Sequence, residues 1–183
     1  MTATRSTSRE GAAPLGVASS EYAAAVEFLM REAELLDDLE ERRWLDEMVS
    51  PDVLYQLPLR QTVERSRGNG IAEGMYHLNE DYGSLSSKVR RNETAYAWAE
   101  DPPSRVRHFV TNVRVRPGEG ANEIAVRSNI LIYRTRQDQV TPQLLSGERH
   151  DVLRDEGKGL RLLRRNVVLD LTVIGTHNLS IFF

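Results

Sequence analysis

The chain has 183 residues, of which 40% are hydrophobic and 28% charged, with a formal net charge of −3 and no cysteine. This length and composition predict one domain with a hydrophobic core, and the slightly acidic balance does not favour nucleic-acid binding, which requires a basic face. The lack of cysteine excludes a disulfide scaffold, a cysteine nucleophile and a thiolate-bound zinc ion or iron–sulfur cluster on this chain.

The N-terminal residues 1–18 predict a disordered arm, because they are rich in Ser, Thr, Gly, Ala and Arg without hydrophobic periodicity. They lack the apolar stretch of a secretory signal, and no apolar run in the chain approaches the roughly 20 residues that a membrane span requires. We therefore expect a cytoplasmic protein with no membrane contact, whose single folded domain covers residues 19–183.

Two helices are predicted after the arm. The first begins at Ser20 and carries apolar residues at three- and four-residue spacing, with the charged residues between them on the solvent face. The second covers roughly 39–49 and ends before Pro51; its Trp44 is expected in the core. The apolar residues of the first helix are Tyr22, Val26, Leu29, Met30, Ala33 and Leu36.

The middle of the chain mixes a strand, a loop and a helix. Alternating apolar residues predict a strand over 53–63, which Pro58 makes an edge or bulged strand. The polar, glycine-rich segment 64–82 indicates a long loop. A short helix is expected over 84–91, with Leu85 and Val89 facing inward.

Four strands are predicted in the second half, over 105–116, 124–134, 144–154 and 160–171. The second of them alternates most clearly, with one face apolar apart from a serine. Helices followed by long strands favour an α+β class. The order fits a cystatin-like or NTF2-like cone, in which a curved antiparallel sheet wraps around the N-terminal helices. The inward residues of 124–134 are Ile124, Val126, Ser128, Ile130 and Ile132.

The segment 97–115 combines a rigid turn with an unusually polar strand. Pro102 and Pro103 cannot lie in the middle of a sheet, since each removes a donor and fixes φ. From Arg105 the chain alternates, and so much Arg, His and Asn on one strand requires carboxylate or carbonyl partners. One face is expected to carry Arg105, Arg107, Phe109, Thr111, Val113 and Val115, and the other Val106, His108, Val110, Asn112 and Arg114.

The sequence motif WAEDPPSR-x-RH-x-V-x-NV-x-V resembles the signature of the β (small) subunits of bacterial aromatic-ring-hydroxylating dioxygenases, the Rieske non-haem iron oxygenases. Three later segments resemble the same family in the same order, and the likeness runs from about Glu21 to Phe183. They are the segments RHDVLR (149–154), RRNVVLD (164–170) and NLSIFF (178–183).

The resemblance implies the cone fold and a non-catalytic role in an α₃β₃ hexamer, with contacts between the β subunits. A Rieske [2Fe–2S] cluster and a mononuclear Fe(II) would lie on the partner α subunit. A reductase and a ferredoxin would deliver electrons from NADH, and the complex would cis-dihydroxylate an aromatic ring with O₂. The signature resembles the toluene, biphenyl and naphthalene branch more than the benzoate branch. A Rieske cluster requires two Cys and two His, so the chain, having no cysteine, cannot hold one.

The candidate functional residues are therefore subunit-interface residues, with no catalytic, cofactor or metal site expected on this chain. Charged contacts are predicted at the turn, where the two prolines fix its shape, and inter-subunit hydrogen bonds along the strands. The apolar C-terminal segment either fills the domain's own core or docks on a neighbouring subunit, and we favour docking. The candidates are Glu100, Asp101, Pro102, Pro103, Arg105, Arg107, His108, Asn112, Arg149, Asp170, Asn178, Leu179, Phe182 and Phe183.

A free-standing cone-fold enzyme working by acid–base chemistry, such as an isomerase or dehydratase, is the alternative. It requires a pocket with a carboxylate, His or Tyr of perturbed pKa, and a plain binding module of the same fold is a third hypothesis. Many arginines on the same strands favour an interface over a pocket for a small apolar substrate. The acid–base candidates are Tyr55, His108, Asp151 and Asp170.

Overall fold

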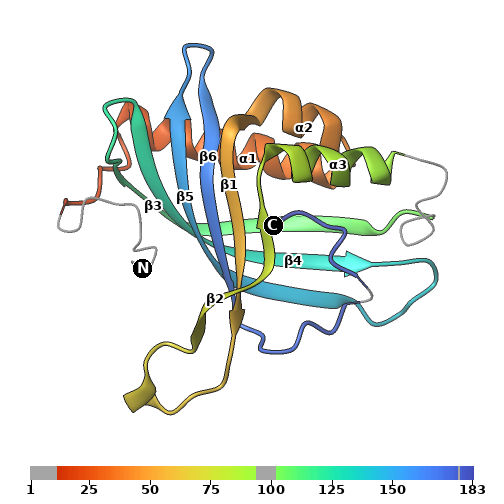
Figure 1. Cartoon of the computed structure of the whole chain (residues 1–183). Coiled ribbons are helices and arrows are strands. Elements are labelled where there is room, and N and C mark those ends of the chain that lie inside the picture. The colour runs from red at the N-terminus through yellow and green to blue at the C-terminus, as the bar shows by residue number, and fades with distance from the viewer. Residues whose placement is uncertain (1–11, 94–101, 177) are drawn as a thin grey trace.

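The computed structural model describes residues 12–93, 102–176 and 178–183, and they form a curved sheet with helices on its concave side (Figure 1). The helices are α1 (Ser20–Asp37), α2 (Glu41–Met48) and α3 (Tyr82–Asn92), with a short 3₁₀ helix, η1 (Arg65–Arg67). The strands are β1 (Val49–Arg60), β2 (Ile71–Glu80), β3 (Arg105–Pro117), β4 (Glu123–Thr135), β5 (Gln143–Asp155) and β6 (Leu160–Leu169).

The described strands form one sheet in the order β2-β1-β6-β5-β4-β3. This architecture confirms the predicted α+β cone. The expectation of a wholly antiparallel sheet is wrong at one pair, because β1 and β6 run parallel. A parallel pair requires a long crossover connection, and here the whole of β2 to β5 lies between the two strands.

The predicted loop over 64–82 is wrong in part, since Ile71–Glu80 forms β2 and pairs with β1. β2 is an edge strand with no buried position, so it lacks the apolar alternation of a strand packed on one face. Pro58 lies opposite Tyr76, where the register shifts on both sides of the proline. The predicted bulge in β1 is therefore confirmed.

Helix α1 begins at the predicted place, and the Ser19 hydroxyl accepts a hydrogen bond from the Tyr22 N–H at 3.2 Å. Its buried stripe is rotated relative to the prediction. Met30, expected inside, is 64% exposed, whereas Glu32, expected on the solvent face, is 1% exposed. The buried residues are Ala25, Phe28, Leu29, Glu32, Leu35 and Leu36.

The inward residues of the other elements agree better with the prediction. Trp44 of α2, and Leu85 and Val89 of α3, are buried as expected, and so is the predicted inner face of β4. None of the described helices is long and apolar enough to span a membrane.

Strand β3 contains a bulge that the alternation rule missed. Asn112 has a positive φ of 54°, and the pairing with β4 shifts register between Thr111 and Arg114. An extra residue moves the following side chains to the opposite face. Val115 is therefore buried on the same side as Val106, not on the side of Arg105 as predicted.

Part of the predicted N-terminal arm lies against β3. The Leu15 N–H donates to the Val115 carbonyl at 2.8 Å, and Arg116 Nε donates to the Ala12 carbonyl at 3.2 Å. Ala12 and Leu15 are thus bonded to β3, while 1–11 lie outside the described residues.

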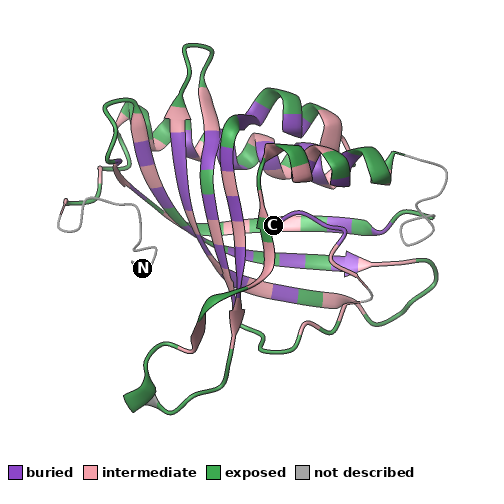
Figure 2. Cartoon of the chain, viewed as in Figure 1, coloured by how far each residue is buried: buried purple, intermediate pink, exposed green. Residues whose placement is uncertain are grey.

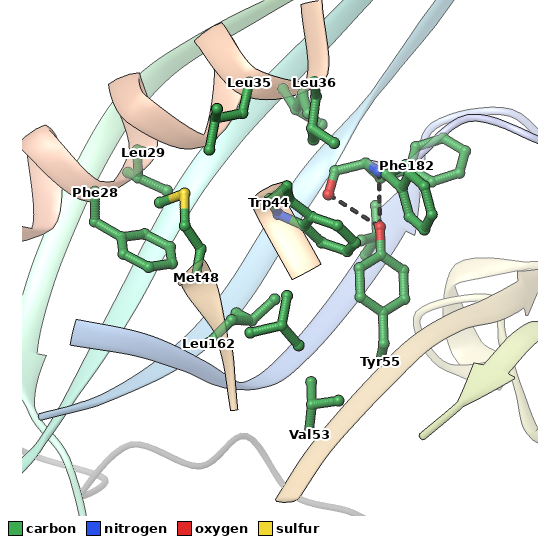
Figure 3. Packing of buried hydrophobic residues seen from close by; sticks show 14 of the residues in the cluster. Phe28, Leu29, Leu35, Leu36, Trp44, Met48, Val53, Tyr55, Leu162 and Phe182 are labelled. Carbon is green, nitrogen blue, oxygen red and sulfur yellow. Dashed lines mark hydrogen bonds between the residues drawn. The ribbon is translucent and has the colours of Figure 1, made fainter. Parts of the chain in front are cut away.

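The core fills the space between the helices and the concave face of the sheet (Figure 2). The C-terminal segment enters it: Phe182 is 3% exposed and Phe183 is fully buried. The Phe182 and Trp44 ring centroids lie 4.5 Å apart (Figure 3). Our preference for docking of Phe182 and Phe183 on a neighbouring subunit is therefore wrong, because both rings are covered by this chain's own core.

Candidate functional site

The concave interior of the cone, where an acid–base enzyme requires its pocket, contains a buried ion network. Glu32 enters from α1, Arg149 and Asp151 from β5, and Arg165 from β6. Strand alternation explains the arrangement, since Arg149 and Asp151 are two residues apart on one face and Arg165 pairs with Asp151 across β5 and β6. Two carboxylates and two guanidinium groups give the network no net charge.

Arg165 is the centre of the network. Its Nε and Nη2 donate to the two Asp151 carboxylate oxygens, each at 2.8 Å. Its Nη1 and Nη2 also donate to Glu32, at 2.9 and 2.7 Å. A planar guanidinium matched to two carboxylates in this way gives strong, oriented hydrogen bonds.

Glu32 accepts two further hydrogen bonds, from Trp44 Nε1 at 3.0 Å and from Arg149 Nη1 at 3.1 Å. Burial works to raise the pKa of Glu32, but Arg165 and Arg149 outweigh it and lower that pKa overall. Burial, the largest effect, acts to lower the pKa of Arg165, but Asp151 and Glu32 raise it well above its ordinary value. Both groups are therefore held in their charged forms by one another.

Tyr55 bonds the main chain of the C-terminal segment, and dashed lines mark these hydrogen bonds of its hydroxyl in Figure 3. Its hydroxyl accepts from the Phe183 N–H at 2.7 Å and donates to the Phe183 main-chain oxygen at 3.0 Å. The same oxygen accepts from Arg165 Nη1 at 2.6 Å. Burial raises the pKa of Tyr55 to about 12. This hydroxyl is thus an anchor for Phe183 and not a free acid.

Lys88 of α3 holds the same segment from the other side. Its Nζ donates to the Ile181 carbonyl at 2.9 Å and lies 4.5 Å from the centre of the Phe182 ring. Burial lowers the pKa of Lys88 to about 8, against the opposing charges of Glu41 and Glu80. The folded state is therefore less stable with Lys88 protonated, as it is at pH 7, than it would be with Lys88 deprotonated.

This shift predicts a pH dependence that a Lys88→Met variant should lack. Between pH 8 and 10.5 the unfolded chain binds more protons than the folded one, so stability should rise with pH across that interval. Over this interval the free energy of unfolding of the wild type should rise by about 2–3 kcal/mol more than that of Lys88→Met. Urea denaturation at pH 7.5 and 10 measures this gain, and parallel pH profiles would contradict it.

The other acid–base candidates are also engaged. His108 Nδ1 lies 2.6 Å from Asp37 Oδ1, and its Nε2 lies 3.1 Å from the Phe182 carbonyl. His108 thus bridges α1 to the C-terminal segment, although we expected it to bond another subunit. Asp170 lies on the opposite, outer side of the sheet, where it accepts from Ser146 Oγ at 2.8 Å. Tyr55 and Asp151 therefore both contact Arg165 but not each other directly, and His108 and Asp170 have other partners.

Arg149 corrects another interface prediction. Its side chain is 1% exposed, and it donates to Glu32 and to Ser128 Oγ within this chain. Glu32 of α1 lies against Arg149 inside the cone, so this buried guanidinium has no exposed surface to offer a neighbour. Asn178 likewise bonds internally, where its Oδ1 accepts from Arg134 Nη2 at 2.9 Å, and Leu179 packs against the core.

The remaining interface candidates lie at the surface where they are described. Arg105, Arg107, Asn112 and Pro103 are exposed, and Pro102 is exposed beside them. Glu100 and Asp101 lie outside the described residues. These positions stay predictions of contact with another subunit.

Two members of the network, Glu32 and Arg165, were absent from the candidates. Glu32 lies on the same helix face as the buried Phe28, Leu29, Leu35 and Leu36. A charged residue at a position of the apolar stripe is the sequence signal that could have identified it. Among the described residues, no cluster of three His, Cys, Asp or Glu side chains is placed to hold a metal ion.

Comparison with known proteins agrees with this architecture. A family described as the ring hydroxylating beta subunit matches residues 31–176. A chain of naphthalene 1,2-dioxygenase, solved with indole bound in the active site, is 29% identical with a TM-score of 0.78, and the match covers 87% of this chain and 83% of that one.

The β subunit of benzoate 1,2-dioxygenase from Burkholderia mallei is 22% identical, with a TM-score of 0.63 and coverage of 85% of this chain and 93% of that one. At this lower identity the likeness shows the fold alone. The family match covers most of the chain, including β1 to β6 and the buried network. The chain therefore belongs to the family of ring-hydroxylating dioxygenase β subunits.

Proposed function

We propose that this chain is the non-catalytic subunit of a cytoplasmic terminal oxygenase and supports a catalytic α subunit in an α₃β₃ complex. The complex adds both atoms of O₂ to an aromatic ring and yields a cis-dihydrodiol, with electrons from NADH delivered through a reductase and a ferredoxin. Likeness to a naphthalene 1,2-dioxygenase chain supports a neutral aromatic hydrocarbon as the substrate class.

The observation that carries this proposal is the buried ion network in the interior of the cone. Its titratable groups are bound to one another or to the C-terminal segment: Arg165 to Glu32 and Asp151, and Tyr55 to Phe183. An acid or base for catalysis must reach a proton on a substrate. These groups are instead bonded within the fold, which suits a supporting subunit better than the free-standing acid–base enzyme.

The redox groups of such an oxygenase do not fit this chain. A Rieske cluster takes two Cys and two His ligands, and the chain has no cysteine. We therefore place the cluster and the mononuclear iron on the partner α subunit.

Co-expression with a candidate catalytic α subunit tests the proposal. The chain alone should purify colourless and without iron, and together they should form an iron-containing complex with a mass near six subunits. Arg105→Ala, at the exposed start of β3, should weaken that complex without changing its iron content per α subunit. A stable, active protein that forms without the partner would contradict the proposal and favour the acid–base enzyme.

A further inference from the structure

We propose that Asn69 is a site of spontaneous covalent modification, at which the side-chain amide is lost and aspartate and isoaspartate are formed. The reaction is an intramolecular cyclisation followed by hydrolysis, and water is its only co-reactant. Asn69 precedes Gly70 in the connection between β1 and β2, and this is the one Asn-Gly pair in the sequence. The inference does not depend on the proposed function, because this chain contains every reacting group.

The connection between β1 and β2 is open to water. Figure 1 shows it projecting away from the helices, with the short helix η1 near its tip. Asn69 lies between η1 and β2, and both it and Gly68 are exposed. The water that is consumed in the hydrolysis step can therefore reach the side chain in the folded protein.

The residue that follows Asn69 suits the reaction, because the main-chain nitrogen of Gly70 is the nucleophile. Glycine has no Cβ, so no side chain stands beside this nitrogen and blocks its approach to Asn69 Cγ. Gly70 has a φ of 76°, which glycine adopts without steric penalty. A Cβ at this position would lie 2.5 Å from the Gln61 carbonyl oxygen, so the turn itself requires glycine here.

The side chain of Asn69 is turned toward the backbone that follows it. The Ile71 N–H donates to Asn69 Oδ1 at 3.1 Å, which is the local hydrogen bond that Asn forms with the backbone two residues on. This bond holds the side-chain carbonyl on the side of Gly70. Oδ1 gains negative charge when the nitrogen attacks Cγ, and an N–H that already donates to Oδ1 stabilises that charge.

The reaction proceeds in two balanced steps. First, the Gly70 nitrogen forms a bond with Asn69 Cγ, the Cγ–Nδ2 bond breaks, and the proton of the Gly70 amide leaves with Nδ2 as ammonia. The product is a five-membered succinimide ring. Water then opens this ring at either carbonyl. Opening at Cγ gives aspartate, whereas opening at the main-chain carbonyl gives isoaspartate, in which the main chain runs through Cγ.

Both products change the open end of the β1–β2 hairpin. Each replaces a neutral amide by a carboxylate and so adds one negative charge, and isoaspartate also adds a main-chain carbon before Gly70. The Gly70 carbonyl accepts from the Gln61 N–H at 2.7 Å, next to the pair formed by Arg60 and Ile71. A longer main chain displaces Gly70 from Gln61. The end of the pairing between β1 and the edge strand β2 should therefore loosen.

Asn79 is a matched control within the same hairpin. It is also exposed, and its Oδ1 also accepts a hydrogen bond, from Gln56 Nε2 at 2.9 Å. However, Asn79 pairs with Gln56 inside the β1–β2 ladder, and the next residue is Glu80, whose side chain flanks the nitrogen that would attack. We therefore expect reaction at Asn69 and none at Asn79.

Incubation of the full chain under native conditions at pH 8, followed by trypsin digestion and mass spectrometry, tests the proposal. Cleavage after Arg67 and Lys88 leaves both asparagines in one peptide. Asn69 should lose its amide with time and give two products that separate by chromatography, whereas Asn79 should keep its amide. Retention of the Asn69 amide in the folded chain overturns the proposal, and so does equal loss at Asn69 and Asn79.

Asn69→Gln separates the chemistry from general ageing of the sample. The longer side chain would have to close a six-membered ring, so amide loss at residue 69 should stop. Hydrogen exchange at the Gln61 and Ile71 amides should become faster in the incubated wild type and stay unchanged in incubated Asn69→Gln. Equal changes in the two proteins would show that the modification does not loosen the hairpin.

Discussion

Replacing Arg165 by methionine should lower the free energy of unfolding by about 3–5 kcal/mol, because it leaves buried charges without their partner. Arg165 is fully buried and bonds both Glu32 and Asp151. Its removal leaves two carboxylates with Arg149 as the one remaining guanidinium of the network. Urea denaturation of the isolated chain at pH 7 measures the loss.

Arg164→Met is the matched control for this prediction. Arg164 is the preceding residue of β6 and lies on the exposed outer face, so its substitution should change the free energy of unfolding by about 0.5 kcal/mol or less. Equal losses in the two variants would show that the buried network does not hold α1 to the sheet.

The stability of Arg165→Met should depend on acidic pH differently from that of the wild type. The lowered pKa of Glu32 contributes stability above its ordinary pKa of 4.5, and this contribution is lost as the pH falls through the folded-state pKa. Without Arg165, the pKa of the buried Glu32 carboxyl group should rise, so the variant gains relative stability as Glu32 takes up a proton. The difference in the free energy of unfolding between the wild type and Arg165→Met should therefore become smaller as the pH falls toward and below 4.5.

Replacing Phe183 by alanine should cost about 3–5 kcal/mol of stability in the isolated chain, as for other fully buried aromatic residues. The ring is fully buried, and the backbone of the same residue is bonded to Tyr55 and Arg165. The substitution removes the ring and leaves the backbone groups able to form those hydrogen bonds. The decrease in the free energy of unfolding therefore measures the contribution of ring packing. Thermal or urea unfolding of the chain without any partner measures it.

Met30→Ala serves as the control, because Met30 is 64% exposed and its truncation should have little effect. If Phe183→Ala left the isolated chain unchanged and weakened only the complex, the C-terminal segment would be a docking element after all. The two results distinguish a core role from an interface role for Phe183.

Local patterns account for the parts of the structure that sequence predicted well. Apolar periodicity located α1, α2 and α3, and strict alternation located the inner face of β4 from Ile124 to Ile132. These features depend on spacing along one element, which the sequence displays directly. The signature around Arg105 and the absence of cysteine likewise pointed to a supporting subunit of an oxygenase without reference to any contact.

Features that depend on two segments were missed or misassigned. The sequence of β2 predicts a loop, because its pairing with β1 and not its own hydrophobic pattern makes it a strand. Phe182 and Phe183 were expected at an interface because their apolar character does not say which surface covers them. Asn112 shifted the faces of β3 through a single bulged residue.

The sequence by itself determined the fold class, the number and order of most elements, the family, and the exclusion of a Rieske cluster from this chain. Only the tertiary structure decided that Glu32, Arg149, Asp151 and Arg165 form one neutral buried network and that the C-terminal rings lie against it. The physical reason is that a charged residue is costly to bury alone and stable when paired. Its burial therefore depends on partners brought from distant strands, which no local pattern contains.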